Sequence, residues 1–420
     1  MLTQAPRGTK DVLPKESGRW QALEAVMRDA AAMAGYREIR TPVFEHTELF
    51  LRGVGDTTDI VQKEMYTFKD KGDRSITLKP EGTAGAVRAL IEHSLYADVL
   101  PVKMYYLNAP IFRYEAPQSG RYREHHQFGL ECFGAQNPSV DAELITLAYR
   151  MIEKLGVTNL TVNINSIGCP KCRPNYHARL KEFLAGKLSD LCGSCKERFE
   201  RNPLRALDCK EEKCQRLVKD APNMLDMLCD ECGDHFSKLQ QYLATAGLPY
   251  AVDSRIVRGL DYYTKTVFEL IIATPNGNLT VCGGGRYDRL VEELGGPSMP
   301  GVGFGMGIER LLMLLESQNV ALDVGRQVDV YVASLGDDAK LPAYKLMLAL
   351  REAGIKAECD HMGRSLKAQF KYADKLQTPF IAILGGDELQ KGVVKVRDMS
   401  TREEKEIPID QAAQEIKSLL

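Results

Sequence analysis

The stretch Arg258-Gly-Leu-Asp-Tyr-Tyr263 is the most informative part of this sequence, because three further blocks complete what it lacks. Alone it is a polar turn followed by two aromatic residues. The further blocks are Phe112-Arg-Tyr-Glu115, Cys282-Gly-Gly-Gly-Arg-Tyr-Asp288 and Gly303-Phe-Gly-Met-Gly-Ile-Glu-Arg310. Together the four blocks supply arginines, glycines and acidic residues in a pattern that predicts a nucleotide-binding site on a β-sheet.

Arg113 and Glu115 lie two residues apart on an expected strand, so both side chains should leave the same face of the sheet. A guanidinium group can hold a phosphate through two hydrogen bonds, and a carboxylate beside it can accept from a base or a ribose. The alternative is an exposed cross-strand salt bridge.

The returning strand carries a second polar set. Gln127, Gly129 and Glu131 share one face by the same alternation. Gly129 should leave a gap of about the size of a ligand between two polar groups. An amide and a carboxylate beside such a gap suit an ammonium or imidazole donor, although a polar pair that satisfies itself is the simpler alternative.

Gly303, Gly305 and Gly307 alternate along a strand, and Arg310 follows one turn into an apolar helix. Alternating glycines let one strand face lie flat against a nucleotide, with the arginine over a phosphate. The spacing differs from G-x-G-x-x-G, which disfavours a nicotinamide site, and no G-x-x-x-x-G-K-[ST] occurs.

Composition is that of a soluble globular protein. The chain has 420 residues, of which 44% are hydrophobic and 27% charged, enough for two to four domains. A net charge of −2 means that any contact with nucleic acid must come from local basic patches. The sequence shows neither a membrane span nor a secretory signal, so we expect a cytoplasmic protein with no membrane partner.

Eight of the eleven cysteines form pairs in one region. In a reducing compartment such pairs indicate metal ligands before disulfides, because two thiolates can face one tetrahedral zinc ion. The alternative is a helical insertion whose thiols bind nothing. The spacing leaves open which pairs would share an ion, and His235 is a further candidate ligand, although a solvated histidine is the simpler interpretation. The candidate zinc ligands are Cys169, Cys172, Cys192, Cys195, Cys209, Cys214, Cys229 and Cys232.

Apolar periodicity predicts the order of the elements. Helices are expected over 17–34, 141–155 and 308–315, and strands through 39, over 160–165, and through 270 and 281. A hairpin should span 103–134 with a polar loop over 115–124, and short helices should fill the cysteine-rich stretch to about 246.

After residue 326 strands alternate with helices, which indicates a small α/β domain. Arg364, Lys367, Lys371 and Lys375 are spaced three and four residues apart, so one helix face should carry four cations. A solvated helix face and a phosphate-binding stripe both fit this spacing.

These blocks resemble the class II aminoacyl-tRNA synthetases, and most closely the bacterial type of the histidyl-tRNA synthetase family. Gly35-Tyr-Arg-Glu-Ile-Arg-Thr-Pro42 is similar to motif 1 of the class, and the blocks that begin at Phe112 and Gly303 are similar to motifs 2 and 3. The blocks that begin at Arg258 and Cys282 resemble signatures specific to the histidine family, as does the opening Arg7-Gly-Thr-Lys-Asp-Val-Leu-Pro14.

The resemblance and the element pattern together imply four parts. The first is an α+β catalytic domain, residues 1–166 and 247–318, with a mainly antiparallel sheet flanked by helices. A helical cysteine-rich insertion, 167–246, interrupts it. A linker, 319–326, then leads to a C-terminal α/β anticodon-binding domain with a mixed sheet, 327–420.

The resemblance also implies a site for L-histidine. Glu81 and Thr83, on either side of Gly82, would hold the amino group. Gln127 and Glu131 would lie beside the substrate. Tyr262 and Tyr263 would shape the imidazole pocket with the turn around Gly284, and Arg113 and Arg258 would complete the set of histidine-binding residues.

For ATP with Mg²⁺, the resemblance places Arg113 on the α-phosphate, Arg310 on the γ-phosphate and Arg258 opposite Arg113. These three arginines are the expected catalytic residues. Glu115, Arg121 and Gly305 would complete the nucleotide site. The implied reaction is attack by the carboxylate of histidine on the α-phosphate, followed by transfer of the acyl group to tRNA(His).

For tRNA, the resemblance implies that Arg121 and Arg123 contact the acceptor stem and that the four cations of the C-terminal domain contact phosphates. The motif 1 region would form a homodimer. A noncatalytic regulatory or histidine-sensing subunit with the same fold is the main alternative, but it should lack the C-terminal α/β domain and should also lose Arg258 or Arg310. A zinc-organised RNA-binding protein would leave the glycine and arginine blocks unexplained.

Overall fold

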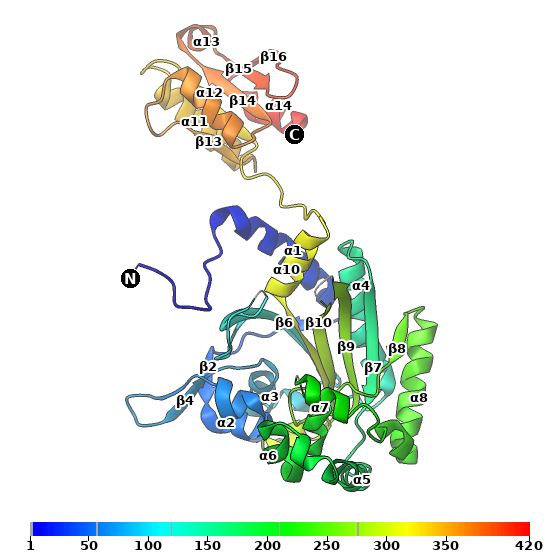
Figure 1. Cartoon of the computed structure of the whole chain (residues 1–420). Helices are drawn as coiled ribbons and strands as arrows, with labels where there is room; N and C mark the ends of the chain where they lie inside the picture. Colours follow the sequence, from blue (N-terminus) through cyan, green and yellow to red (C-terminus); the bar gives the residue numbers. More distant parts are fainter. Residues whose placement is uncertain (1–2, 56–57, 119, 210, 275–276) are drawn as a thin grey trace. The chain divides into compact units, whose positions relative to one another are not determined.

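The structure is a computed structural model that describes residues 3–55, 58–118, 120–209, 211–274 and 277–420. It divides into two compact units, Met1–Asp323 and Val324–Leu420 (Figure 1). Among the helices in these ranges, none is both long enough and apolar enough to cross a membrane.

An eight-stranded sheet forms the centre of the first unit. Its strands follow the order β1, β5, β6, β11, β10, β9, β7, β8. Neighbours are antiparallel except at the two edges, where β1 runs parallel to β5 and β8 runs parallel to β7. The predicted mainly antiparallel sheet is therefore confirmed. The strands are β1 (Arg37–Glu38), β5 (Val102–Phe112), β6 (Glu124–Phe133), β7 (Leu160–Ser166), β8 (Tyr250–Val252), β9 (Thr264–Thr274), β10 (Gly277–Arg286) and β11 (Gly301–Gly307).

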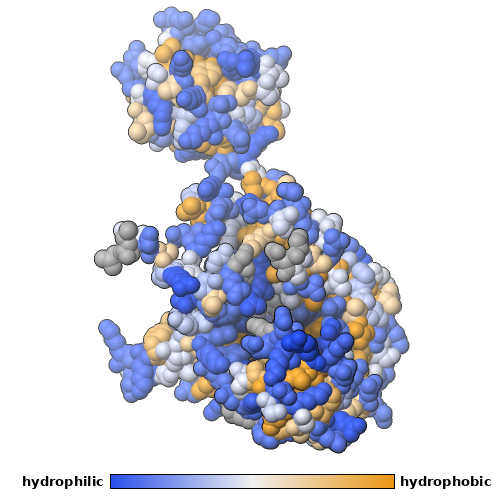
Figure 2. All heavy atoms as spheres, in the orientation of Figure 1, coloured by the Kyte–Doolittle hydropathy of each residue, from blue (hydrophilic) through white to orange (hydrophobic). Residues whose placement is uncertain are grey.

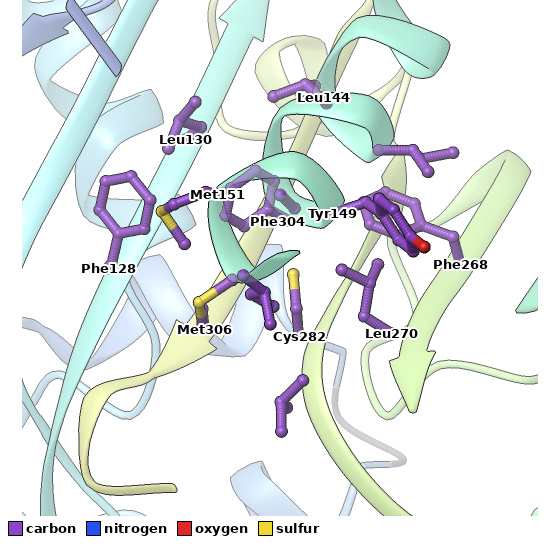
Figure 3. Packing of buried hydrophobic residues seen from close by; sticks show 14 of the residues in the cluster. Phe128, Leu130, Leu144, Tyr149, Met151, Phe268, Leu270, Cys282, Phe304 and Met306 are labelled. Atoms are coloured by element: carbon purple, nitrogen blue, oxygen red, sulfur yellow. The ribbon is translucent and has the colours of Figure 1, made fainter. Parts of the chain in front are cut away.

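Helices cover one face of this sheet and enclose the main apolar core. They are α1 (Pro14–Met33), α4 (Pro138–Lys154), α8 (Asp230–Thr245) and α10 (Ile308–Ser317). Side chains from β6, β9, β10 and β11 interdigitate here with those of α4 (Figure 3). Because neighbouring residues of a strand point to opposite faces, the second face of the same strands is free for polar residues.

The sequence explains where α1 begins and ends. Pro14 occupies the first turn, where its missing N–H costs nothing. Leu23, Met27 and Ala31 recur every fourth residue and are buried. Gly35 then adopts a φ of 78°, the left-handed conformation that ends helices. The helix predicted over 17–34 is therefore present with its glycine stop.

A smaller layer lies against the second face of the large sheet. It contains a three-stranded antiparallel sheet in the order β2, β4, β3. The elements of this layer are β2 (Phe44–His46), α2 (Thr47–Gly53), η1 (Ile60–Glu64), β3 (Thr67–Lys69), β4 (Ser75–Leu78), α3 (Thr83–Glu92), η2 (Leu95–Ala97) and α9 (Leu290–Glu293). Helix α3 contacts β6, which brings its first turn to the polar face of the sheet.

Short helices form the insertion between β7 and α8 and pack on a small core of their own. They are α5 (Arg173–Ala185), η3 (Leu188–Asp190), α6 (Gly193–Arg201), η4 (Pro203–Ala206), α7 (Glu212–Leu217) and η5 (Met224–Met227). The predicted helical, cysteine-rich insertion is confirmed.

The second unit has the predicted mixed sheet, which has five strands and helices on both faces. Its order is β13, β12, β14, β15, β16, with parallel pairing around β12 and antiparallel pairing beyond β14. Its elements are β12 (Val330–Ser334), α11 (Lys340–Glu352), β13 (Ala357–Cys359), α12 (Leu366–Lys375), β14 (Phe380–Leu384), α13 (Gly386–Lys391), β15 (Val393–Asp398), β16 (Glu404–Pro408) and α14 (Ala412–Leu419).

Candidate active site

Glycines from two strands form the floor of a cavity on the polar face of the large sheet. Gly283 of β10 pairs with Gly305 of β11, and Gly307 follows on the same face. The cavity has a volume of about 190 Å³ and is bounded by Arg113, Arg121, Arg258, Arg310, Glu115, Gln127 and Thr280, among others. Figure 2 shows the first unit hollowed on this side, with mainly hydrophilic residues around the opening. The predicted flat glycine strand therefore exists at Gly305 and Gly307 but not at Gly303, and it meets four arginines.

Arg113 reaches this cavity from a loop. Strand β5 ends at Phe112, so the expectation that Arg113 and Glu115 share a strand face was wrong. The backbone turns sharply instead, because the amide of Glu115 donates to the carbonyl of Arg113 at 2.8 Å. The Nε of Arg113 donates to the carbonyl of Pro80 at 2.7 Å, which fixes the guanidinium. Both residues still line the same cavity.

Arg258 lies on the opposite side of the floor. Its guanidinium lies over Gly283, where an added Cβ would approach within 2.6 Å. It forms an ion pair with Glu269 of β9. Its Nε is buried and has no hydrogen-bond partner among the described residues. A buried donor without a partner carries a desolvation cost that a bound anion would remove.

Arg310 holds the tip of the β5–β6 hairpin. Its Nε donates to the carbonyl of Gly120 and its Nη1 to the carbonyl of Thr280, both at 3.0 Å. Burial, and then the neighbouring Arg121, lower the pKa of Arg310. A cation in such surroundings is stabilised by an incoming anion, which fits the predicted contact with phosphate.

A network of buried polar groups lies on the same face of β6 as Gln127, which lines the cavity. Thr83 donates to Glu131 at 2.7 Å, and the hydroxyl of Tyr106 donates to the same oxygen at 3.2 Å. The hydroxyl of Tyr287 donates to the other carboxylate oxygen. Glu81 caps helix α3, because both of its oxygens accept from backbone amides of the first turn. The structure thus brings together Glu81, Thr83 and Glu131, as the resemblance implied.

Burial perturbs both carboxyl groups. It is the largest cause that raises the pKa of Glu131 to about 8, against an ordinary value of 4.5. Burial also raises the pKa of Glu81. Two buried carboxyl groups that resist ionisation form a strong site for a cation, because a positive ligand removes the cost of ionising them.

A tyrosine fills the gap expected beside Gly129. An added Cβ at Gly129 would lie 2.2 Å from the ring of Tyr106, so the glycine makes room for this ring and not for a ligand. The open-gap prediction was therefore wrong. Gly303 has a similar role, because an added Cβ there would lie 2.0 Å from an oxygen of Glu131. The position of Tyr106 on the strand that pairs with β6 was the only feature of the sequence that could have indicated its role.

Tyr262 and Tyr263 lie side by side, with ring centroids 4.7 Å apart. The hydroxyl of Tyr262 donates to Glu81 at 3.4 Å. Gly285 packs against Tyr263, whereas an added Cβ at Gly284 would meet the backbone of the neighbouring strand at 2.2 Å. These glycines lie within strand β10, so the expectation of a turn around Gly284 was wrong. Gly283 lines the cavity and Gly284 does not. Sequence reasoning left Tyr287 and Glu269 without a role. Tyr287 belongs to the network around Glu131, and Glu269 pairs with Arg258.

Of the two basic residues of the hairpin loop, Arg121 lines the cavity and Arg123 packs beside it on the loop. Arg121 lies 3.9 Å from Glu115. Arg123 stacks over the ring of Tyr114 at 4.0 Å, and its backbone amide donates to Gly8 at 2.8 Å. The opening segment of the chain therefore helps to shape this loop.

The cysteines form two groups of four, nested along the chain. The outer group joins Cys169 and Cys172 to Cys229 and Cys232, and the inner group joins Cys192 and Cys195 to Cys209 and Cys214. Within each group all sulfur atoms lie within 4.8 Å of one another. His235 belongs to neither, because its Nε2 lies buried near Asp141 and Thr266. The expectation of a solvated histidine was thus wrong.

The basic stripe of the second unit is smaller than predicted. Helix α12 begins at Leu366, so Arg364 precedes it. Arg364 pairs with Asp360 at 2.8 Å and lies over the ring of Tyr372. The remaining lysines of the stripe, Lys367, Lys371 and Lys375, are exposed on the helix.

A glycine-floored antiparallel sheet, with arginines from a hairpin loop and from the start of a helix, defines a class II aminoacyl-tRNA synthetase. Residues 8–311 match the family described as "Histidyl-tRNA synthetase" and residues 329–419 match "Anticodon binding domain". The chain belongs to the histidyl-tRNA synthetase family.

Individual relatives agree over the full length. The chain is 58% identical to a histidine–tRNA ligase of Caldanaerobacter subterraneus subsp. tengcongensis over 100% of both chains. It is 54% identical to a histidine–tRNA ligase of Clostridium perfringens over 98% of both. Apo histidyl-tRNA synthetase of S. aureus has a similar structure, with a TM-score of 0.85, 39% identity and 99% coverage of both chains.

Proposed function

We propose that this protein activates L-histidine with ATP to form histidyl-adenylate and then transfers the histidyl group to the 3′ end of tRNA(His). The observation that carries the proposal is a pair of chemical environments on one face of the large sheet, connected by strand β6, on which Gln127 lines the cavity and Glu131 lies in the polar network. Arginines from three parts of the chain surround the floor of the cavity, and the histidine-family residues Glu81, Thr83 and Glu131 form the buried network.

The ammonium group of histidine would bind at that network. Glu81, Thr83 and Glu131 supply its acceptors, next to Gly82 and Gln127. Tyr262 and Tyr263 would contact the imidazole ring. A site that pairs both imidazole nitrogens rejects other amino acids, because those would leave buried polar groups unpaired. Gly284 would act indirectly, by allowing close approach of the neighbouring strand.

ATP would enter as its Mg²⁺ complex and lie on the glycine floor beside Gly305. Arg113 and Arg258 approach the floor from opposite sides, which suits the two sides of the α-phosphate. Arg310 and Arg121 would bind the outer phosphates. Glu115, at the same rim, offers the carboxylate oxygen that Mg²⁺ or a ribose hydroxyl prefers.

The chemistry then needs no protein nucleophile. The carboxylate of histidine attacks the α-phosphorus in line, the bond to the bridging oxygen breaks, and pyrophosphate leaves. Negative charge grows on the α-phosphate oxygens in the transition state. Guanidinium groups held in place beforehand stabilise that charge without reorganising, which is the largest catalytic contribution expected for this class of reaction.

Transfer to tRNA would use the cavity rim and the second unit. Arg121 and Arg123 lie on the hairpin loop, within reach of an acceptor stem that enters the cavity. The second unit would bind the anticodon, with Arg364, Lys367, Lys371 and Lys375 near phosphates. We place the reaction in the cytoplasm, where tRNA is charged.

The assignment of parts follows the same logic. Residues 1–166 and 247–318 would form the catalytic domain, 167–246 the insertion, 319–326 a linker and 327–420 the anticodon-binding domain. A homodimer would form through the motif 1 region, where Val43 and Phe44 expose apolar surface. Val99 and Leu100, between η2 and β5, are also exposed.

Zinc would act as a structural ion in the insertion. The insertion core is small, and five of its thirteen buried residues are cysteines. Small modules with so little apolar core usually require a metal or a covalent crosslink.

Amino-acid-dependent exchange between ATP and pyrophosphate tests the proposed activity. We expect exchange with histidine alone among the twenty amino acids, in the presence of Mg²⁺ and without tRNA. A folded sample that supports exchange with none of them would favour the noncatalytic regulatory subunit instead.

A further inference from the structure

We propose that each group of four cysteines binds one zinc ion, and that the two ions hold the insertion against both ends of the Arg258–Tyr263 segment. The metal sites would therefore set the shape of the histidine pocket as well as stabilise the insertion. The activity readouts below rest on the proposed function, whereas the metal and protease readouts do not.

The sulfur geometry fits zinc, and the eight cysteines are free thiols in the structure. The Sγ atoms of Cys169 and Cys172 are 3.7 Å apart, those of Cys169 and Cys229 are 3.9 Å apart, and those of Cys192 and Cys209 are 3.7 Å apart. Four thiolates at about 2.3 Å from a tetrahedral zinc ion would lie about 3.8 Å from one another. A disulfide needs a separation of about 2.05 Å.

The backbone around each group favours thiolates. Cys192 and Cys229 occupy the N-cap positions of α6 and α8, and Cys172 the N-cap position of α5. The positive end of a helix stabilises a thiolate there. Backbone amides also donate to sulfur, from Cys192 to Cys214 at 3.2 Å and from Cys229 to Cys172 at 3.1 Å. Such outer hydrogen bonds are typical of metal-bound ligands.

A residue close to the inner group in the chain contacts the start of the Arg258–Tyr263 segment. Arg205 of η4 lies between Cys195 and Cys209 in the chain, and its side chain is 8% exposed. Its guanidinium donates to the carbonyl of Arg258 at 2.8 Å and to Asp261 at 2.7 Å. Asn202, at the end of α6, donates to the same oxygen of Asp261 at 2.9 Å.

The inner group also borders the catalytic arginines. A cavity of about 620 Å³ is lined by Cys192 and Cys209 on one side and by Arg113, Arg121 and Arg310 on the other. Loss of the inner ion would therefore release one wall of the space that substrates enter.

The outer group leads to the end of the segment. Arg173 follows Cys172 and begins α5. It donates to the carbonyl of Tyr263 and, at 3.3 Å, to the carbonyl of Ile167. Lys265 pairs with Glu231, next to Cys232, at 2.9 Å. The segment is thus held at its end by Arg173, which directly follows Cys172, and at its start by Arg205, which lies four residues before Cys209.

Elemental analysis of the purified full chain gives the first test. We expect two zinc ions per chain, and one in each of Cys195→Ser and Cys232→Ser, which alter the inner and outer groups. Cys359→Ser, in the second unit and outside both groups, should keep two. Replacement by Co²⁺ should give the intense sulfur-to-metal absorption of tetrathiolate sites. A chain that holds fewer than two ions overturns the proposal.

Variants of Arg205 distinguish the effect of the metal sites on the histidine pocket from their effect on the folding of the insertion. We expect Arg205→Met to keep both zinc ions and to raise the KM for histidine at least tenfold with a smaller change in the KM for ATP. Cys195→Ser should produce the same split, and Arg205→Lys should recover part of the loss. Unchanged histidine KM in Cys195→Ser and Arg205→Met would refute the link to the pocket.

Trypsin provides a readout that needs no catalysis. Release of the segment should accelerate cleavage after Arg258 at least several-fold in Cys195→Ser and Arg205→Met, relative to Cys359→Ser. This result would support the metal proposal even if the wild-type chain showed no histidine-dependent exchange. Unchanged cleavage in both variants would overturn it.

Discussion

Arg258 has surroundings that suit an anion. Glu269 balances its charge on one side, while its Nε is buried with no hydrogen-bond partner among the described residues. The side chain is 21% exposed, so the guanidinium borders the cavity and not the apolar core. A change at this residue should therefore affect catalysis far more than folding.

We expect Arg258→Ala to reduce histidine-dependent pyrophosphate exchange at least about 100-fold, because a donor aimed at the transition-state charge is lost. The midpoint of thermal unfolding should change little. Arg255→Ala is a matched control, since Arg255 lies on the same loop, 78% exposed and paired only locally with Asp253. A large fall in stability with unchanged activity would place Arg258 in a structural role.

Glu131 makes stability depend on pH. Burial raises its pKa from 4.5 to about 8, so the folded protein keeps a proton that the unfolded chain has released between these values. Its contribution to stability is therefore fully present below pH 4.5 and is lost as the pH rises through about 8. Glu131→Gln should flatten that fall.

Urea denaturation at pH 6 and at pH 8.5 measures the effect. The wild-type protein should lose more free energy of unfolding between the two values than Glu131→Gln does. Glu352→Gln, at an exposed position of the second unit, should lose as much free energy of unfolding between the two pH values as the wild-type protein does. An equal loss of free energy of unfolding in all three proteins would show that Glu131 ionises normally.

The packing of strand β5 on strand β6 depends on the glycine at position 129. Tyr106 of β5 crosses onto β6 directly over Gly129, and its hydroxyl reaches Glu131. The strand pair can therefore carry a large ring and a buried carboxylate on one face only if position 129 has no side chain.

Gly129→Ala should lower the free energy of unfolding by about 1–3 kcal/mol, because the added methyl group displaces the ring of Tyr106 in a packed site. Histidine binding should weaken as well, since Tyr106 holds Glu131. Gly186→Ala, at the end of α5 where nothing lies within 4 Å, should change stability by no more than about 0.5 kcal/mol. Equal stabilities for the two variants would contradict this view of the hairpin.

The residues of the candidate active site all lie in one of the two compact units. Each has its own sheet and its own apolar core, which is the usual sign of parts that fold independently. The arginines of the cavity and the polar network around Glu131 all belong to the first unit. Adenylate formation should therefore need only that unit.

We expect a chain truncated after Asp323 to keep histidine-dependent pyrophosphate exchange within about tenfold of the full chain, because the boundary cuts no core. Charging of tRNA(His) should fall much further, since the proposed anticodon contacts are removed. The full chain assayed in parallel for both reactions is the reference. Equal losses in both reactions would mean that the second unit supports the catalytic one.

Short-range patterns in the sequence were sufficient for the elements and the family. Apolar periodicity and a glycine stop placed α1, the hairpin followed from alternation and turn residues, and the α/β character of the second unit followed from strands that alternate with helices. The Arg258 and Cys282 blocks were specific enough to indicate the histidine family. Each of these features depends on residues that are close together in the chain.

Contacts between distant residues had to be seen in three dimensions. Three contacts join positions that lie between 17 and 60 residues apart in the chain. They are the nested pairing of the cysteines, the packing of the Tyr106 ring over Gly129, and the ion pair between Arg205 and Asp261. Strand order and register decide which of these side chains meet, and neither is encoded by local spacing. The end of β5 before Arg113 also involves distant residues, because the amide of Tyr114 donates to the carbonyl of Glu64 and the side chain of Arg113 donates to the carbonyl of Pro80.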